Sequence, residues 1–138
     1  MPYLNVDDAM DEHPKIEVLS DAAFRMHMSA MLYAARRKTD GFIPRAKARR
    51  LSDSASDAVA AELVQANVWH DLGEGCDRPD CIEARTCKEQ GKPGHYLLHD
   101  FLQWNHSAHW WDERRRKDQE RQAEWRAKNG KAAKKVRK

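Results

Sequence analysis

The sequence predicts an α+β fold, mainly helical with a small antiparallel sheet, and three observations support this prediction. Apolar residues recur at helical spacing in residues 21–38 and again in residues 57–67. Between them, GFIP at 41–44 combines a glycine turn, a short extended segment and a proline at a helix start. Two further extended stretches, 68–69 and 96–100, flank a long segment with three cysteines. A helix, a strand, two helices and two paired strands in this order make a winged helix-turn-helix.

The first helix is expected from residue 21 to residue 38, with Ser20 as its N-cap. One face of this helix carries apolar residues at i, i+4, i+7 and i+11, namely Phe24, Met28, Met31 and Ala35. His27 lies beside that face with no partner near it in sequence, so we interpret it as a partly buried or surface histidine rather than a ligand. Upstream, residues 13–19 are expected to be extended, because Pro14 disfavours helical dihedral angles in the residue before it, His13.

The second and third helices are expected to form the helix-turn-helix. Residues 39–41 form a turn, residues 42–43 a short strand, and Pro44 begins the second helix, which runs to about residue 51. Serines between residues 52 and 56 can cap the third helix. The inner face of that helix carries Val59, Leu63 and Ala66. Asn67 is expected to end it in the left-handed conformation.

The cysteines suggest a metal site between the last two strands. They are separated by four and five residues, at Cys76, Cys81 and Cys87. Residues 73–94 contain few apolar side chains, so hydrophobic packing could hardly order them, whereas three thiolates and one imidazole could bind a structural zinc ion. His95 is expected as the fourth ligand with His70 as the alternative, while His99 lies on a strand and can instead anchor the wing. Unligated thiols are the competing interpretation, because there is no tight C-x-x-C pair.

Charge is distributed unevenly along the 138 residues. Residues 112–138 contain twelve Lys or Arg and five Asp or Glu, a net +7, so the other residues carry −4 of the total of +3. We therefore expect a winged-helix domain at 1–106 with a cysteine-bearing insertion at 70–95. Residues 107–138 are expected to be a charged helix that begins near Ser107, followed by a disordered basic tail after Gly130. Such a basic region suits contact with a polyanion, and a solvated terminus is the alternative.

The predicted helix-turn-helix, together with this charge pattern, suggests double-stranded DNA as the partner. The expected contacts come from the second, third and C-terminal helices: Arg45, Lys47, Arg49, Arg50, Ser54, Ser56, Gln65, Arg114, Arg115, Arg116, Lys117 and Arg121. The third helix has the position of a recognition helix, yet it contains no Lys or Arg and includes Asp57 and Glu62. Attraction to phosphates is therefore expected from the second helix and from the C-terminal region.

Several short motifs occur in an order that resembles a known family. They are HPK at 13–15, TDGFIP at 39–44, LVQANVW at 63–69 and HDFLQWN at 99–105, followed by an Arg-rich helix. Over residues 14–126 the chain is similar to small winged-helix DNA-binding proteins of actinobacterial phages, whose relatives include the N-terminal domains of phage replication initiators. The resemblance implies a winged-helix fold, DNA binding, and a role in replication or transcriptional regulation in the cytoplasm of the host cell.

A protein-interaction adaptor is the alternative function, because the acidic body and Trp110, Trp111 and Trp125 could dock a host or phage protein. An enzyme is not expected, since the sequence has no Gly-rich phosphate loop and no H-E-x-x-H motif. No apolar run approaches the roughly 20 residues of a membrane span, and no basic start precedes an apolar run. The sequence therefore predicts a cytoplasmic protein with no membrane partner.

Overall fold

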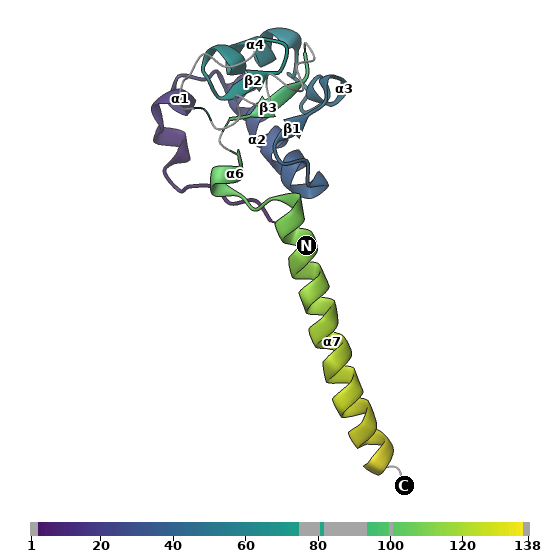
Figure 1. Ribbon diagram of the computed structural model, residues 1–138. Coiled ribbons are helices and arrows are strands. Elements are labelled where there is room, and N and C mark those ends of the chain that lie inside the picture. Colours follow the sequence, from purple (N-terminus) through teal and green to yellow (C-terminus); the bar gives the residue numbers. More distant parts are fainter. Residues whose placement is uncertain (1–2, 75–80, 82–93, 100, 137–138) are drawn as a thin grey trace. The chain divides into compact units, whose positions relative to one another are not determined.

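The structure is a computed structural model that describes residues 3–74, 81, 94–99 and 101–136 (Figure 1). It divides into two units, Met1–His106 and Ser107–Lys138. The first unit combines several helices with a three-stranded antiparallel sheet, and the second unit contains one long helix.

The helix α2 (Asp21–Arg37) begins where the sequence predicted. The Ser20 hydroxyl accepts a hydrogen bond from the Ala23 N–H, which confirms the predicted N-cap. Its buried face is rotated from the expected one and comprises Ala23, Met26, His27, Ala30, Met31 and Ala34. Met31 is the buried member of the expected set, whereas Phe24, Met28 and Ala35 are partly buried beside the core. Alanines form the inner face because a close-packed core needs small residues where helices approach, and a search for large apolar residues misses them.

Two shorter helices follow in the predicted order, α3 (Arg45–Ala48) and α4 (Asp57–Gln65). The helix α3 is shorter than expected, because Pro44 is an extended N-cap and the Ser- and Asp-rich residues 52–56 favour local turns over helix. The Ser56 hydroxyl caps α4 by accepting from the Val59 N–H, and Asn67 has the expected positive φ, 60°. α4 packs against α2.

Three short strands form an antiparallel sheet in the order β1-β3-β2. β1 (Phe42–Ile43) and β2 (Trp69–Asp71) both pair with the central strand β3 (Tyr96–Leu98). Directly paired residues share a face of a sheet. One face therefore carries Ile43, Trp69, Tyr96 and Leu98, which belong to the main core, and the other carries Phe42, His70 and Leu97. Asp71 is the partner of Tyr96, so residues 72–95 leave and re-enter the sheet at adjacent positions.

The N-terminal arm, residues 3–19, differs from the prediction. Residues 13–19 were expected to be extended, but Pro14–Glu17 form the helix α1, preceded by the 3-10 turn η1 (Met10–Glu12). His13 is extended, as a residue before proline should be, yet its Nδ1 caps α1 by accepting from the Lys15 N–H. Pro14 therefore occupies the first helical position, where its missing N–H costs nothing. Ile16 joins the buried core.

Two helices follow the sheet. The short helix α6 (Phe101–Trp104), which the sequence did not predict, places Phe101 in the core. The helix α7 (Ala108–Val136) begins after Ser107, whose hydroxyl accepts from the Trp110 N–H, as predicted for an N-cap. It continues through Gly130 to Val136, past the expected start of a disordered tail. Lysine and alanine dominate residues 131–136, and both are good helix formers.

The α+β class and the small antiparallel sheet are thus confirmed. The element order α2-β1-α3-α4-β2-β3 and the central position of β3 are compatible with a winged-helix layout. In the described part of the chain, no helix is both long enough and apolar enough to cross a membrane.

Candidate metal centre and basic helix

Two histidines meet on the sheet face that carries Phe42 and Leu97. His70 lies on β2 opposite Leu97, and His99 follows two residues after Leu97 along the neighbouring strand. This diagonal relation places both side chains on the same face. Their ring centroids are 4.5 Å apart, and the His99 N–H donates to the Val68 carbonyl at 3.0 Å, which holds the end of β3 beside the start of β2. His70 is only 4% exposed.

Cys81 completes a cluster with these two histidines. Its Sγ lies 3.3 Å from Nε2 of His70, and one ligand atom each from His70, Cys81 and His99 lie within 4.8 Å of one another. In a tetrahedral zinc site with bonds of about 2.0–2.3 Å, neighbouring ligand atoms are roughly 3.5 Å apart. The His70–Cys81 distance already fits this geometry, and no two of the three ligand atoms are more than 4.8 Å apart. Two imidazoles and a thiol are therefore placed compatibly with a bound metal ion.

The other predicted metal ligands are Cys76, Cys87 and His95. Cys76 and Cys87 lie outside the described residues. His95 precedes β3, four residues and roughly 13 Å of strand away from His99. Its ring stacks on Phe42 with centroids 5.9 Å apart, and its Nδ1 accepts a 3.4 Å hydrogen bond from the Arg45 N–H. Among the described residues, the cluster contains the alternative ligand, His70, together with His99, and does not include His95. The strand register could have shown this, but it is known only once β2 and β3 are paired.

The basic residues of α3 and of the two positions after it are partly engaged by their own domain. Arg49 donates two hydrogen bonds to the Asp57 carboxylate, at 2.9 and 3.0 Å. These bonds and the opposite charge lower the pKa of Asp57 and raise that of Arg49. The Lys47 ammonium lies 5.2 Å from the centroid of the Tyr33 ring of α2. Arg45 and Arg50 are exposed, so residues 45–50 present fewer available cations than their sequence suggested.

The polar residues of α4 also serve the domain itself. The Ser56 hydroxyl is occupied as the N-cap, and Glu62 accepts hydrogen bonds from the Ser20 N–H and hydroxyl, at 2.9 and 2.8 Å. The exposed side chains of α4 are Asp57, Ala58, Ala61 and Gln65, and Ser54 is exposed just before it. A paired aspartate, two alanines and a glutamine offer few groups for base edges. α4 is consequently better suited to scaffolding than to reading bases.

The second unit carries a stripe of cations interrupted by one aromatic side chain. We define the basic stripe of α7 as the residues at i, i+3, i+7, i+11 and i+14: Arg114, Lys117, Arg121, Trp125 and Lys128. This spacing places them on one helical face. All five are exposed, Trp125 to 66%. Arg115 and Arg126 lie outside the stripe, roughly a quarter to a third of a turn around the helix axis from Arg114.

Ion pairs along α7 leave part of this charge available. Arg116 bridges Glu113 at 3.0 Å and Glu120 at 2.6 Å, and Arg121 pairs with Asp118. The Arg114 guanidinium lies 5.3 Å from the Trp110 ring centroid. Among the described residues, Lys117 and Lys128 take part in no salt bridge. The helix therefore combines internal charge pairs with cations that can meet an external anion.

His27 is more deeply buried than the partly buried or surface position predicted for it. It is 7% exposed, and its Nδ1 accepts a 3.0 Å hydrogen bond from the indole N–H of Trp69. Burial lowers the pKa of His27 to about 4, so the ring is neutral near pH 7. The sequence signal was present, since His27 shares the alanine-rich face of α2 with Ala23, Ala30 and Ala34.

No family model, curated protein or solved structure matches this chain. Function is therefore inferred from the residues themselves.

Proposed function

We propose that this chain is a double-stranded DNA-binding protein. In this proposal the first unit is a winged-helix domain with a structural zinc ion, and α7 supplies most of the attraction to DNA phosphates. The observation that carries the proposal is the basic stripe of α7, in a region whose net charge is +7. A role in phage replication or transcriptional regulation agrees with the order of the short motifs.

The exposure of α7 supports a polyanionic partner. Every side chain from residue 119 to residue 130 is exposed, so α7 gains little from apolar packing there. Its excess positive charges repel one another, and neutralisation by phosphates removes that repulsion while releasing counterions. Trp125 within the stripe adds a flat surface that can stack against a sugar or a base.

The metal cluster supports the domain part of the proposal. The donors come from β2, from the residue after β3 and from the segment between them, so one ion would fasten that segment to the sheet. His70 and His99 would supply imidazole ligands and Cys81 a thiolate, with a fourth ligand from Cys76 or Cys87. A bound zinc ion would supply structural cross-linking rather than chemistry.

The DNA proposal is tested by the salt dependence of binding to a random 30-base-pair duplex, measured by fluorescence anisotropy with the full chain. Each phosphate contact contributes about 0.9 to the slope of log K against log salt. The double variant Lys117→Gln/Lys128→Gln, which removes two stripe cations, should reduce the slope by about 1.8.

The matched control is Arg115→Gln/Arg126→Gln, which removes the same charge from positions outside the stripe. It should reduce the slope by less than the stripe variant does. Equal losses in both variants would show that net charge alone attracts the duplex. Absence of duplex binding by the unmodified chain at about 50 mM salt would overturn the proposed function.

The zinc component has its own test. Protein purified without a metal-affinity column should contain near-stoichiometric zinc by elemental analysis, and Cys81→Ser and His70→Ala should each lower the zinc content. His95→Ala is the control, because His95 stands apart from the cluster and should leave zinc unchanged. Unchanged melting of the zinc-free protein, compared with the same protein after zinc addition, would argue against a structural ion.

A protein-interaction adaptor is the second candidate, favoured by the 66% exposure of Trp125. Exposed tryptophans are frequent anchors at protein interfaces. A pull-down with and without nuclease separates the two functions: a partner retained after nuclease, and lost in Trp125→Ala, would favour the adaptor.

A further inference from the structure

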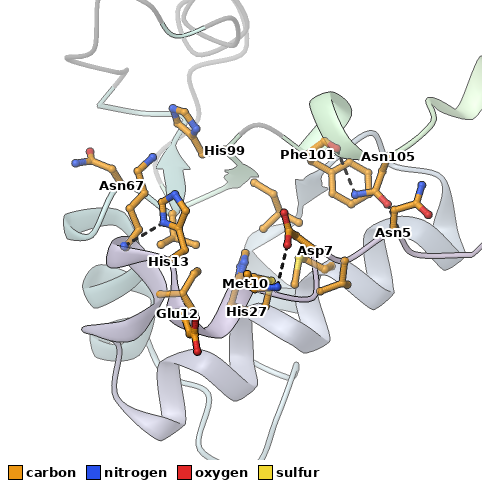
Figure 2. Close-up of a pocket in the computed structure, with 17 residues that line it drawn as sticks. Asn5, Asp7, Met10, Glu12, His13, His27, Asn67, His99, Phe101 and Asn105 are labelled. Carbon is orange, nitrogen blue, oxygen red and sulfur yellow. Dashed lines mark hydrogen bonds between the residues drawn. The ribbon is translucent and has the colours of Figure 1, made fainter.

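A cavity of about 520 Å³ lies between the N-terminal arm and the core of the first unit. Its walls come from residues 5–16, α2, the end of β3 and α6. The volume is typical of pockets that bind small molecules, which range over about 300–1,000 Å³. Its apolar lining includes Met10, Ile16, Met31, Leu98 and Phe101. Figure 2 shows arm residues Asp7 and Met10 near His27, with Phe101 and Asn105 toward one end and His99 and Asn67 toward the other.

The arm that covers the cavity is held by specific hydrogen bonds. The Asn5 N–H donates to Oδ1 of Asn105 at 2.8 Å, which links the start of the arm to the end of α6. Asp7 Oδ1 accepts from the Ala9 N–H at 2.8 Å and fixes a turn, and the His13 cap fixes the start of α1. The cavity is therefore bounded by ordered backbone on the arm side.

His27 brings an unused hydrogen-bond donor to this cavity. Its Nδ1 accepts from Trp69, so the neutral ring carries its proton on Nε2. In the part of the chain that the structure describes, no group accepts a hydrogen bond from Nε2. The side chain is 7% exposed and lines the cavity, whereas Trp69 is not among the lining residues. A ligand with an acceptor atom at this wall of the cavity can receive the hydrogen bond from Nε2, and that bond adds to its affinity.

We propose that the cavity binds a small, uncharged, mainly apolar molecule whose one hydrogen-bond acceptor receives the Nε2–H of His27. The apolar lining suits an aromatic or aliphatic body of the ligand. The charged residues of the lining favour an uncharged ligand over an anion: Asp7 and Glu12 contribute two negative charges and Lys15 one positive charge. A buried carboxylate beside this net negative charge would also lose its hydration, which a ketone or ether oxygen loses at much smaller cost.

The proposal is tested by two-dimensional NMR of the full chain as purified, with ¹⁵N-labelled histidine. Three naphthalene probes of similar size are used: 2-acetylnaphthalene with a neutral acceptor, 2-ethylnaphthalene without one, and 2-naphthoate with a charged one. The ketone should bind saturably, shift the His27 Nε2–H resonance, and bind about three- to tenfold tighter than the ethyl compound, as one net hydrogen bond implies. The naphthoate should bind more weakly than the ketone.

Each alternative outcome is decisive. No saturable binding of any probe overturns the cavity as a ligand site. Equal binding of the ketone and the ethyl compound with an unchanged Nε2–H resonance overturns the role of His27. Tighter binding of the naphthoate overturns the assignment to uncharged ligands.

A blocking variant links binding to this cavity. Ala9 lies on the exposed arm and lines the cavity, so Ala9→Trp fills space without removing core contacts. It should weaken binding of 2-acetylnaphthalene at least tenfold. The control is Ala58→Trp, which adds the same side chain on the exposed face of α4, outside the cavity, and should leave binding unchanged. Equal binding in the two variants would place the probe elsewhere.

Discussion

Acid should destabilise the first unit through the buried side chain of His27. Burial lowers the pKa of this side chain to about 4 in the folded state, whereas the unfolded chain has the ordinary value of 6.5. A group whose folded pKa is lowered binds protons preferentially when unfolded. Its contribution is therefore complete above about pH 6.5 and is lost as the pH falls from there toward 4. For these two values, the loss between pH 7 and pH 5 is about 2 kcal/mol.

The measurement is urea unfolding of the full chain at pH 5, 6 and 7, followed by circular dichroism. His27→Gln is the reference, because its amide does not titrate in this range and its oxygen can still accept from the Trp69 N–H. Every other titratable group is common to both proteins, so the difference between the two pH profiles isolates His27. Carboxyl groups contribute little above pH 5. Parallel profiles, or an NMR titration that places the His27 pKa near 6.5, would refute the reasoning.

Three further substitutions have definite expected effects on thermal or urea unfolding. Gly41→Ala should destabilise by about 1–3 kcal/mol, because φ is +93° and the new Cβ would lie 3.0 Å from Cβ of Phe101; an unchanged Tm would contradict this. Ser56→Ala should cost about 1 kcal/mol through the lost cap while leaving the proposed DNA binding unchanged, and a loss of that binding would instead assign the hydroxyl to the proposed interface. Trp69→Phe should cost about 1–3 kcal/mol, since Nδ1 of His27 loses its buried donor, and a neutral effect would mean that another donor replaces it.

Local signals predicted most helix boundaries. Ser20, Ser56 and Ser107 each cap a helix through the hydroxyl, and Asn67 has the predicted left-handed conformation. These features depend on residues within a few positions, so the sequence is sufficient to find them. The prediction for residues 14–17 was wrong because proline suits both an extended segment and the first turn of a helix. His13 resolved that ambiguity by supplying a cap, which side-chain type alone did not reveal.

The candidate sites depended on long-range pairing and were less predictable. The pairing of β2 with β3 brings His70 to His99 across 29 positions of sequence, and it leaves His95 at the other end of the strand. The rotated face of α2 likewise depends on how closely α4 approaches. The cationic character of residues 112–138 is visible from composition. The sequence does not reveal that Arg49, a predicted DNA contact, pairs with Asp57. Such competition among neighbours is decided by tertiary structure.

The pairing of Asp71 with Tyr96 has a consequence for how this protein can change over evolution. The two ends of the segment 72–95 are fixed side by side, so insertions or deletions between them need not move the core. Each doubling of a flexible loop adds only about 0.6 kcal/mol of closure cost. The segment can therefore gain or lose length between its cysteines while the surrounding sheet keeps its register. Related chains should accordingly vary most at this point, and a small folded tag inserted there should be tolerated.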